Sequence, residues 1–303
     1  MPELSGSDAT DVTSVYGYPG PLAWGCDPGD AFLATAWRAL VDLWRGQRVV
    51  AVFTRFHPLL GNASLAANFR ATGEADGDSG VIALGPTVSI DCTLDDEMAR
   101  AHYDPKVRRA IDRSRVDGFT TVEDADWARF DAFARLYRET MVRNNAAPSY
   151  FFDDSDFARL RAALPENVHL LMTVRGDDVV AAGILTESGG IVQTYLSASD
   201  RGTHPSPKPL FYDDARRWAR ARGNGVFHLG GGRGSREDSL LEFKGRFSPR
   251  RHTFHIGRWV LDERTYRALA DARMAGMRTP HPDDDGFFPV YRSEEVGPNG
   301  SPR

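Results

Sequence analysis

The chain has 303 residues, of which 41% are hydrophobic and 26% charged, and this is typical of a soluble globular protein of one or two domains. Its formal net charge of −5 argues against a chain that binds polyanions over its whole surface, and no apolar run approaches the ~20 residues of a membrane span. The only cysteines, Cys26 and Cys92, give no disulfide framework, so we expect buried thiols. The acidic amino terminus lacks the features of a secretory signal, which predicts a cytoplasmic protein.

The first predicted elements are two strands and a helix. Arg48–Phe53 and Val81–Leu84 are β-branched runs between turn residues, which is typical of strands. Asp104–Arg115 has Pro105 in its first turn, where a missing N–H has no cost, so we expect a helix there.

The clearest helix is predicted over Asp126–Arg143, because aromatic and apolar residues recur in it every three or four positions. A shorter helix over Asp156–Leu164 ends at Pro165. Three strands follow, over His169–Val174, Val179–Thr186 and Gly190–Ala198. After them we predict a helix over Pro209–Arg222, a strand over Gly225–Leu229, a helix over Ser235–Gly245, a strand over Phe254–Leu261 and a last helix. This order indicates a layered α/β fold with a mixed sheet, not a regular βαβ array.

The two ends of the chain differ from its body. Residues 1–10 and 279–303 are polar or rich in Pro, Asp, Gly and Ser, so we expect a loose leader and a tail. Phe287, Phe288 and Tyr291 in the tail predict that part of it docks on the body.

A glycine-rich turn joins a strand to a helix in VFHLGGGRGSREDSLLEFKGRF, residues 226–247. Ser235 and Asp238 resemble a capping box, and Gly231 and Gly232 let the backbone approach a ligand closely. No Gly-Lys-Ser/Thr follows, and the last glycine of the dinucleotide fingerprint is missing. A structural turn and an anion-binding site are both consistent with this segment.

Lys244 lies at the edge of the apolar stripe formed by Leu240, Phe243 and Phe247. A lysine in this position usually lies along apolar surface with its ammonium in water. The alternative is a positive charge presented to a phosphate or to a developing oxyanion. Local rules favour the first interpretation.

Other segments carry candidate binding residues with ordinary structural alternatives. The loop SVYGYPGPL presents Tyr16 and Tyr18, and Arg143 ends the long helix shortly before Tyr150. An arginine at this end of a helix is also expected from the helix dipole. Basic side chains are concentrated in two short segments, one with Lys106, Arg108, Arg109, Arg113 and Arg115 and the other with Arg246, Arg250 and Arg251. Such a cluster is most often a solvated helix face, and the alternative is a phosphate-binding patch.

Hydrolase and metal motifs find no support in the sequence. His252 and His255 are three apart in a predicted strand and so point to opposite faces. The acidic run 283–285 lacks calcium-loop spacing, and neither G-x-S-x-G nor H-E-x-x-H occurs. We therefore expect no metal and no cofactor.

Taken together, four segments resemble the Fem family of non-ribosomal peptidyltransferases and its relatives of the GNAT acyltransferase fold. They are HLGGGRGSREDSLLEFKGRFS, PKVRRAIDRSRVDGF, ETMVRNNAAPSYFF and the pair SVYGYPGPL and VFTRFHPLL, and their order along the chain adds to the similarity. The resemblance implies two GNAT-like domains with mixed, largely antiparallel sheets. These would be residues 11–118 completed by 252–275, and residues 119–251, before a flexible tail at 276–303.

The resemblance also implies transfer of an amino acid from aminoacyl-tRNA to an amine acceptor, without CoA. By this similarity Lys244 and Phe243 are the catalytic candidates. The implied substrate-binding residues are Arg143, Tyr150, Tyr16, Tyr18, Trp37, Arg38, Gly231 and Gly232, and Arg108, Arg109 and Arg246 would meet RNA phosphates.

One departure from the family concerns the acceptor. Fem enzymes that act on UDP-linked muropeptides have a lysine shortly after the tryptophan that corresponds to Trp37, and here Arg38 follows it. The departure favours a peptide natural product over a cell-wall precursor as acceptor, unless Arg38 compensates. The alternative activity is an acyl-CoA-dependent N-acyltransferase. The prolines in SDRGTHPSPKPLFYDD argue against it, because they remove N–H donors where a GNAT pyrophosphate loop needs them.

Overall fold

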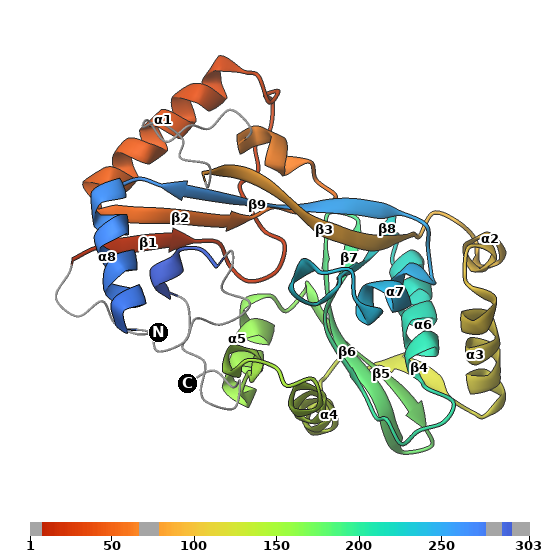
Figure 1. Cartoon of the computed structure of the whole chain (residues 1–303). Helices are drawn as coiled ribbons and strands as arrows, with labels where there is room; N and C mark the ends of the chain where they lie inside the picture. Colours follow the sequence, from red (N-terminus) through yellow and green to blue (C-terminus); the bar gives the residue numbers. More distant parts are fainter. Residues whose placement is uncertain (1–7, 67–78, 277–286, 293–303) are drawn as a thin grey trace. The chain divides into compact units, whose positions relative to one another are not determined.

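The computed structural model describes residues 8–66, 79–276 and 287–292, and the chain divides into two compact units (Figure 1). Unit 1 consists of residues 1–84 and 253–303, and unit 2 of residues 85–252. The strands β3 (Gly80–Asp91) and β9 (Arg251–Val260) each run from one unit into the other. No helix in the described part of the chain is long and apolar enough to span a membrane.

Unit 1 packs helices on a short sheet. Strand β1 (Thr10–Thr13) pairs in parallel with β2 (Val49–Arg55), which pairs antiparallel with β9. Helix α1 (Ala31–Gly46) begins at Asp30, whose side chain accepts the N–H of Phe32, and α8 (Glu263–Gly276) follows β9. The core of this unit comprises Val41, Val49, Val52, Phe56, Ala66, Trp259 and Leu261.

The end of the described chain docks on unit 1 as predicted. Tyr291 is buried, and its hydroxyl donates to Asp11 at 2.6 Å. Phe288 stacks on Tyr266 with ring centroids 5.9 Å apart, whereas Phe287 is exposed. Two of the three aromatic residues therefore fix this segment. Residues 1–7, 67–78, 277–286 and 293–303, which hold most of the expected leader and tail, lie outside the described residues.

Unit 2 is a six-stranded sheet in the order β3-β8-β7-β6-β5-β4. Its pairs are antiparallel except for β7–β8, which is parallel, so the expected mixed and largely antiparallel sheet is confirmed. The strands are β4 (Thr120–Glu123), β5 (Val168–Arg175), β6 (Asp178–Ser188), β7 (Ile191–Ser199) and β8 (Val226–Gly231). The helices are α2 (Asp96–Ala101), α3 (Pro105–Val116), α4 (Phe130–Arg143), α5 (Asp154–Ala163), α6 (Lys208–Ala221) and α7 (Ser239–Gly245).

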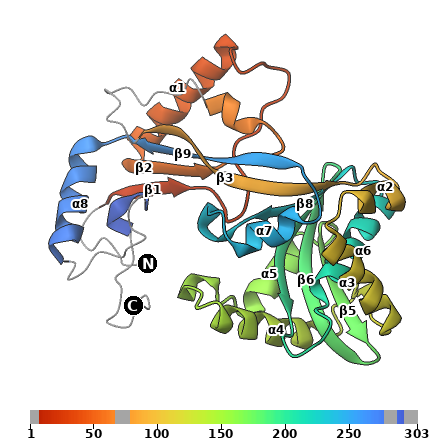
Figure 2. The same ribbon diagram turned by 45° about the vertical axis from the view of Figure 1, so that its right-hand side comes forward.

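Helices cover both faces of this sheet, as Figures 1 and 2 show. On one face α3 and α6 contribute Ile111, Leu210 and Phe211 to a core that also contains Leu171 of β5. On the other face α4 and α5 pack on the neighbouring strand residues Leu170 and Met172. Successive side chains of a strand point to opposite faces, and β5 is therefore buried on both.

Two predicted helices begin later than expected. The helix predicted from residue 126 begins at Phe130, because Trp127 has a φ of 58°, a left-handed conformation that a right-handed helix does not continue through. The helix predicted from Ser235 begins at Ser239, and its N-cap is Asp238. The expected pairing of Ser235 with Asp238 in a capping box is therefore wrong.

The division into units also differs from the expected boundary at residue 118. Residues 85–118 belong to unit 2, because α3 packs on α6 through Val107 and Ile111 and β3 pairs with β8. The strand predicted over 81–84 is accordingly the start of the longer β3. Four elements were not predicted from the sequence: β1, α1, α2 and β4.

Candidate functional site

The parallel strands β7 and β8 pair only at their beginnings. The ladder joins Ile191, Val192 and Gln193 to residues 226–228 and then stops, although β7 continues to Ser199 and β8 to Gly231. The strands β6 and β3 continue the pairing on the outer sides of β7 and β8. Beyond Gln193 and His228 the two strands no longer pair with each other, so backbone N–H and C=O groups on the sides that face each other can bind other partners.

A tight turn after β8 leads to α7 and leaves no room for side chains at two glycines. A Cβ on Gly232 would lie 2.0 Å from the carbonyl oxygen of Arg236, and one on Gly85 would lie 1.8 Å from that of Ser235. The Asp238 carboxylate accepts the N–H groups of Leu240 and Leu241 at the start of α7. The glycine-rich turn therefore has a structural role that holds α7 against the end of β8.

Lys244 of α7 is buried, with 8% of its surface exposed. Its Nζ donates to the carbonyl oxygen of Gly231, the last residue of β8, at 2.7 Å. Burial lowers the pKa of this ammonium from 10.5 to about 8. The negative charge of Asp238 opposes this lowering, and the positive charge of Lys208 adds to it. The expectation that the Lys244 ammonium lies in water is therefore wrong.

Phe243, the residue before Lys244, is half-buried in an aromatic cluster. Its ring meets Tyr212 of α6 at a centroid distance of 5.7 Å and Phe247 at 5.4 Å. The Tyr212 hydroxyl lies 3.2 Å from the hydroxyl of Ser197, on the part of β7 beyond Gln193. The cluster therefore links α7 and α6 to that strand and fixes the backbone on either side of Lys244.

Arg143 is the last residue of α4 and contacts the end of β7. Its guanidinium donates to the Thr140 hydroxyl at 2.9 Å and to the carbonyl oxygen of Ser199 at 3.3 Å. The terminal carbonyls of β7 and β8 thus each accept a hydrogen bond from a cationic side chain, Arg143 for β7 and Lys244 for β8. The structure brings these two predicted site residues to the ends of the same pair of strands.

Lys208, which the sequence analysis did not single out, joins them at the start of α6. Burial lowers its pKa, and so do the charges of Arg143 and Arg233. Within the described residues the Lys208 ammonium has no hydrogen bond and no ion pair. A signal was present in the sequence, because the chain contains only three lysines and Lys208 stands between two prolines, Pro207 and Pro209.

The remaining predicted substrate-binding residues have structural contacts. The Tyr150 carbonyl accepts the Tyr137 hydroxyl at 2.7 Å in unit 2. In unit 1 the Trp37 indole donates to Leu65 at 2.7 Å. Arg38 contacts Thr35 within α1, the Arg55 guanidinium lies 5.9 Å from the Tyr16 ring, and Tyr18 meets Phe254 edge-on at 5.0 Å. Their predicted roles toward substrates stay predictions.

Of the residues predicted to meet RNA phosphates, Arg246 lines a hollow of about 1110 Å³ in unit 2. Arg246 lines it and forms an ion pair with Glu242 at 2.6 Å, and Arg109 is exposed and Arg108 half-buried on α3. Both basic and acidic side chains line this hollow, namely Lys106, Arg246 and Arg251 and Asp104, Glu237, Asp238 and Glu242. The hollow is therefore mixed in charge.

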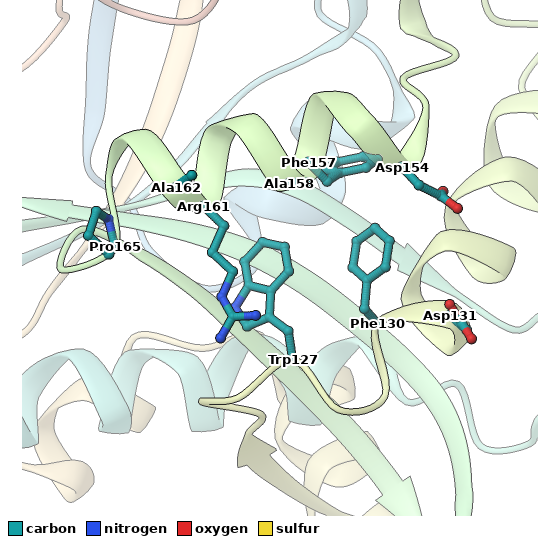
Figure 3. A pocket seen from close by; sticks show the side chains of 9 residues that line it. All are labelled: Trp127, Phe130, Asp131, Asp154, Phe157, Ala158, Arg161, Ala162 and Pro165. Atoms are coloured by element: carbon teal, nitrogen blue, oxygen red, sulfur yellow. The ribbon is translucent and has the colours of Figure 1, made fainter.

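A second hollow of about 630 Å³ is aromatic and lies between the start of α4 and α5 (Figure 3). The Arg161 guanidinium lies over the Trp127 ring at 5.3 Å, and Phe130 stacks on the same ring. Asp131 and Asp154 lie at one end of it. Its lining holds no thiol, hydroxyl or lysine, so it offers no group for acyl transfer. Among the described residues no cluster of His, Cys, Asp and Glu is suited to a metal.

Comparison with known proteins supports the expected fold and class. Residues 99–244 match the acetyltransferase (GNAT) domain family. The structure of FemX is similar with a TM-score of 0.60 and 13% identity, over 84% of each chain. L-PGS from Bacillus licheniformis gives a TM-score of 0.52 and 12% identity, over 78% of this chain and 75% of that one. The C-terminal domain named as that of a lysylphosphatidylglycerol synthetase from Agrobacterium fabrum gives 0.51 and 17%, over 80% and 78%.

No curated protein matches the chain in sequence. The domain match and the FemX-like fold nevertheless confirm the expected resemblance in fold to Fem-type proteins of the GNAT fold. The matched segment contains Arg143, Lys208 and Lys244 and ends at Lys244. The candidate site thus lies inside the segment that matches the GNAT domain family.

Proposed function

We propose that the protein transfers an amino acid from an aminoacyl-tRNA to an amine acceptor and so forms a peptide bond. The observation that carries the proposal is the buried Lys244 ammonium at the end of β8, where the ladder to β7 has stopped. The similarity in fold to FemX and to a domain named for lysylphosphatidylglycerol synthesis supports an aminoacyl group as the cargo.

In the proposed reaction the acceptor amine attacks the ester carbonyl of the aminoacyl group. A C–N bond forms, the carbonyl oxygen becomes an oxyanion, and the C–O bond to the terminal ribose then breaks. The proton lost by the amine goes to the departing ribose hydroxyl, directly or through water. Lys244 stabilises the oxyanion, because a fixed positive charge in a site shielded from water is worth more than one in solvent. The rest of the rate enhancement comes from positioning the two substrates.

The start of α6 favours an ester donor over acyl-CoA. A pyrophosphate bound at a helix start needs backbone N–H donors. Here the N-cap is Pro207 and the second helical residue is Pro209, and neither has an N–H. The departure from the Fem pattern after Trp37, where Arg38 follows in place of the expected lysine, favours an amine of a peptide natural product over a cell-wall precursor as acceptor.

Transfer from charged tRNA tests the proposal. The full chain is incubated with tRNA that carries a radiolabelled amino acid and with a panel of amine acceptors, and labelled amide product is separated from free amino acid. We expect amide formation from at least one charged tRNA, its loss in Lys244→Met, and its retention in the control Arg159→Met, since Arg159 is exposed on α5. Acylation of the same amines from acyl-CoA, with none from any charged tRNA, would refute it.

A further inference from the structure

The aromatic hollow between the start of α4 and α5 shares no lining residue with the site at Lys244 (Figure 3). Its volume of about 630 Å³ suits a small organic molecule, because sites for such ligands typically measure about 300–1,000 Å³. The rings of Trp127, Phe130 and Phe157 line it together with small residues of α5. An apolar wall with a few charged groups is the usual composition of a ligand site.

The aromatic wall is held in place by the fold of unit 2. Phe130 stacks on Trp127 with ring centroids 5.6 Å apart and meets Phe157 at 5.4 Å. Trp127 has a φ of 58°, a left-handed conformation that is unfavourable for a bulky residue. The Asp124 carboxylate holds this turn by accepting the N–H groups of the two residues that follow Trp127. A ligand therefore meets a preformed surface and does not have to order it.

The hollow already holds one cation against this wall. The Arg161 guanidinium lies 5.3 Å from the centroid of the Trp127 ring, and it donates to the carbonyl oxygen of Ala125 at 3.4 Å. The electron-rich face of a tryptophan ring attracts such a cation. Arg161 thus occupies one part of the aromatic wall, whereas the half-buried Phe130 ring is still partly accessible to a ligand.

Two carboxylates lie at one end of the hollow, that of Asp131 in the first turn of α4 and that of Asp154 in the first turn of α5. The helix dipole favours acidic side chains in a first turn, which explains each of them singly. Asp154 pairs with Arg138 at 2.7 Å, whereas the exposed Asp131 has no ion pair within the described residues. The available charge at this end of the hollow is therefore negative.

We propose that the hollow binds an organic ammonium compound with an aromatic body. The body packs against Phe130 and Phe157, and the ammonium pairs with Asp131. An anionic ligand fits less well, because Arg161, the one cation among the described lining residues, is already placed over the Trp127 ring. A neutral ligand would shield the Asp131 carboxylate from water without pairing with it.

Tryptophan NMR tests the site in the full chain. Labelling with ¹⁵N-tryptophan gives six indole N–H signals, and Trp127→Phe identifies that of Trp127. 2-Phenylethylammonium chloride is titrated in, with sodium chloride at equal ionic strength as reference. We expect a saturable shift of the Trp127 signal, while Trp24, which is 84% exposed, reports non-specific contact and shifts little. Shifts of the two signals that are equal and linear in concentration would overturn the proposal.

Probes with the same aromatic body separate the charge from the apolar contact. 2-Phenylethanol and 3-phenylpropanoate have a neutral and an anionic end in place of the ammonium. We expect the ammonium to bind about fivefold more tightly than the alcohol, which is the gain from an ion pair at an exposed carboxylate, and the preference should shrink as salt rises. Equal affinities for the three probes contradict the proposal.

Asp131→Asn removes the charge and keeps the shape of the side chain. The variant should bind the ammonium no more tightly than the alcohol, because the ion pair is lost and the aromatic contact remains. The control Asp177→Asn changes an exposed aspartate in the turn between β5 and β6 and should leave the preference unchanged. A preference for the ammonium that persists in Asp131→Asn is incompatible with the proposed pairing.

Filling the hollow tests the aromatic contact. Ala158→Leu and Ala162→Leu each place a larger side chain in the lining, and both positions are exposed on α5, so a leucine there is compatible with the helix. Each should abolish the saturable shift of Trp127. The matched control Ala163→Leu, exposed on the same helix but outside the lining, should retain it. Thermal melting confirms that each variant is folded, and unchanged binding in both folded lining variants would overturn the site.

A dipeptide identifies the source of the ammonium. If the ligand is the amino end of a peptide, phenylalanyl-alanine should bind more tightly than 2-phenylethylammonium, and if it is a free amine, the order should be reversed. The N-acetylated dipeptide has no ammonium and should bind no better than 2-phenylethanol in either case. Equal binding of the acetylated and the free dipeptide would refute the role of the charge.

Discussion

Lys244 combines burial, a single backbone acceptor and a positive charge close to a second lysine. Burial alone disfavours the ammonium, and Lys208 adds to the shift, so the pKa falls to about 8 although Asp238 opposes it. A lysine that served packing alone would gain nothing from this arrangement, because its charge costs free energy at neutral pH. The side chain is therefore placed for its charge, which is the property that an oxyanion requires.

Replacing Lys244 by methionine separates a role of its charge in the reaction from a role of its side chain in packing. The variant keeps the volume and removes the charge, so we expect transfer to fall by about 100-fold or more while substrate binding changes little. The free energy of unfolding at pH 7 should not fall by more than about 1 kcal/mol, because loss of the bond to Gly231 is offset by loss of a buried charge. Kinetics and urea denaturation measure the two quantities. Comparable losses in activity and in stability would assign Lys244 a structural role.

The pH dependence of stability gives an independent measure of the same side chain. Below about pH 8 Lys244 is protonated in both the folded and the unfolded chain, and its full penalty is present. Between about pH 8 and 10.5 the folded chain releases this proton first, so stability rises with pH by up to about 1.4 kcal/mol per pH unit from this group. The wild type should therefore gain stability relative to Lys244→Met from pH 8 to 10 in urea denaturation. A constant difference would show an unshifted pKa.

The sequence analysis reached Lys244 through family resemblance, not through local rules. The spacing from Leu240 to Phe247 correctly placed it at the edge of an apolar stripe, and that position predicted an exposed ammonium. Its burial depends on the carbonyl of Gly231, 13 residues earlier, and on the packing of α6, which helical periodicity does not report. Lys208 was missed for a related reason, since its neighbours Arg143 and Arg233 are distant in sequence.

At the scale of elements, the cap of α7 controls the position of Lys244. The helix has seven residues, too few to be stable by itself, so its start depends on Asp238 and its position on the packing of Leu241 and Phe247. The same carboxylate also pairs with Arg233, and its charge opposes the lowering of the Lys244 pKa that burial causes. One side chain thus links helix formation to the charge state of the site.

Asp238→Ala should therefore have a larger effect on activity than its effect on stability explains. Loss of an N-cap typically costs about 1 kcal/mol, and Asp153→Ala, which removes the cap of α5, provides the matched control. We expect similar losses of stability in the two variants in urea denaturation. Only Asp238→Ala should lower kcat, because Lys244 then loses its favourable carboxylate and its proton. Equal activities in the two variants would contradict this role of the cap.

Element boundaries were predicted well where periodicity was strong and poorly where a turn intervened. The helix over 105–116 and the three strands over 168–199 lie within a few residues of their predicted ranges. The start of α4 was misplaced because Trp127 fits the apolar stripe but adopts a left-handed turn. Helix α1 was not predicted, although Asp30 and the spacing of Leu33, Trp37 and Val41 are typical of a capped amphipathic helix.

At the scale of the whole molecule, the candidate site residues are distributed unevenly between the two units. Arg143, Lys208, Arg233 and Lys244 all belong to unit 2, a continuous segment of residues 85–252. This unit has two cores, one on each face of its sheet, and the buried network of Tyr103, Asp213 and Arg216 adds to one of them. Unit 1 contains four of the residues that the resemblance assigns to substrate binding, namely Tyr16, Tyr18, Trp37 and Arg38.

The fragment of residues 85–252 should fold by itself and keep the buried bond between Lys244 and Gly231. A domain of this size buries enough apolar surface for cooperative folding, and its sheet is covered on both faces. We expect a sigmoidal urea transition and dispersed amide NMR signals, with a Lys244 side-chain signal like that of the full chain. Transfer to the acceptor should be lost, because Tyr16, Tyr18, Trp37 and Arg38 are missing. A fragment that stays unfolded would show that the stability of unit 2 depends on residues 1–84 or 253–303. A folded fragment that still transfers would show that unit 2 alone binds the acceptor.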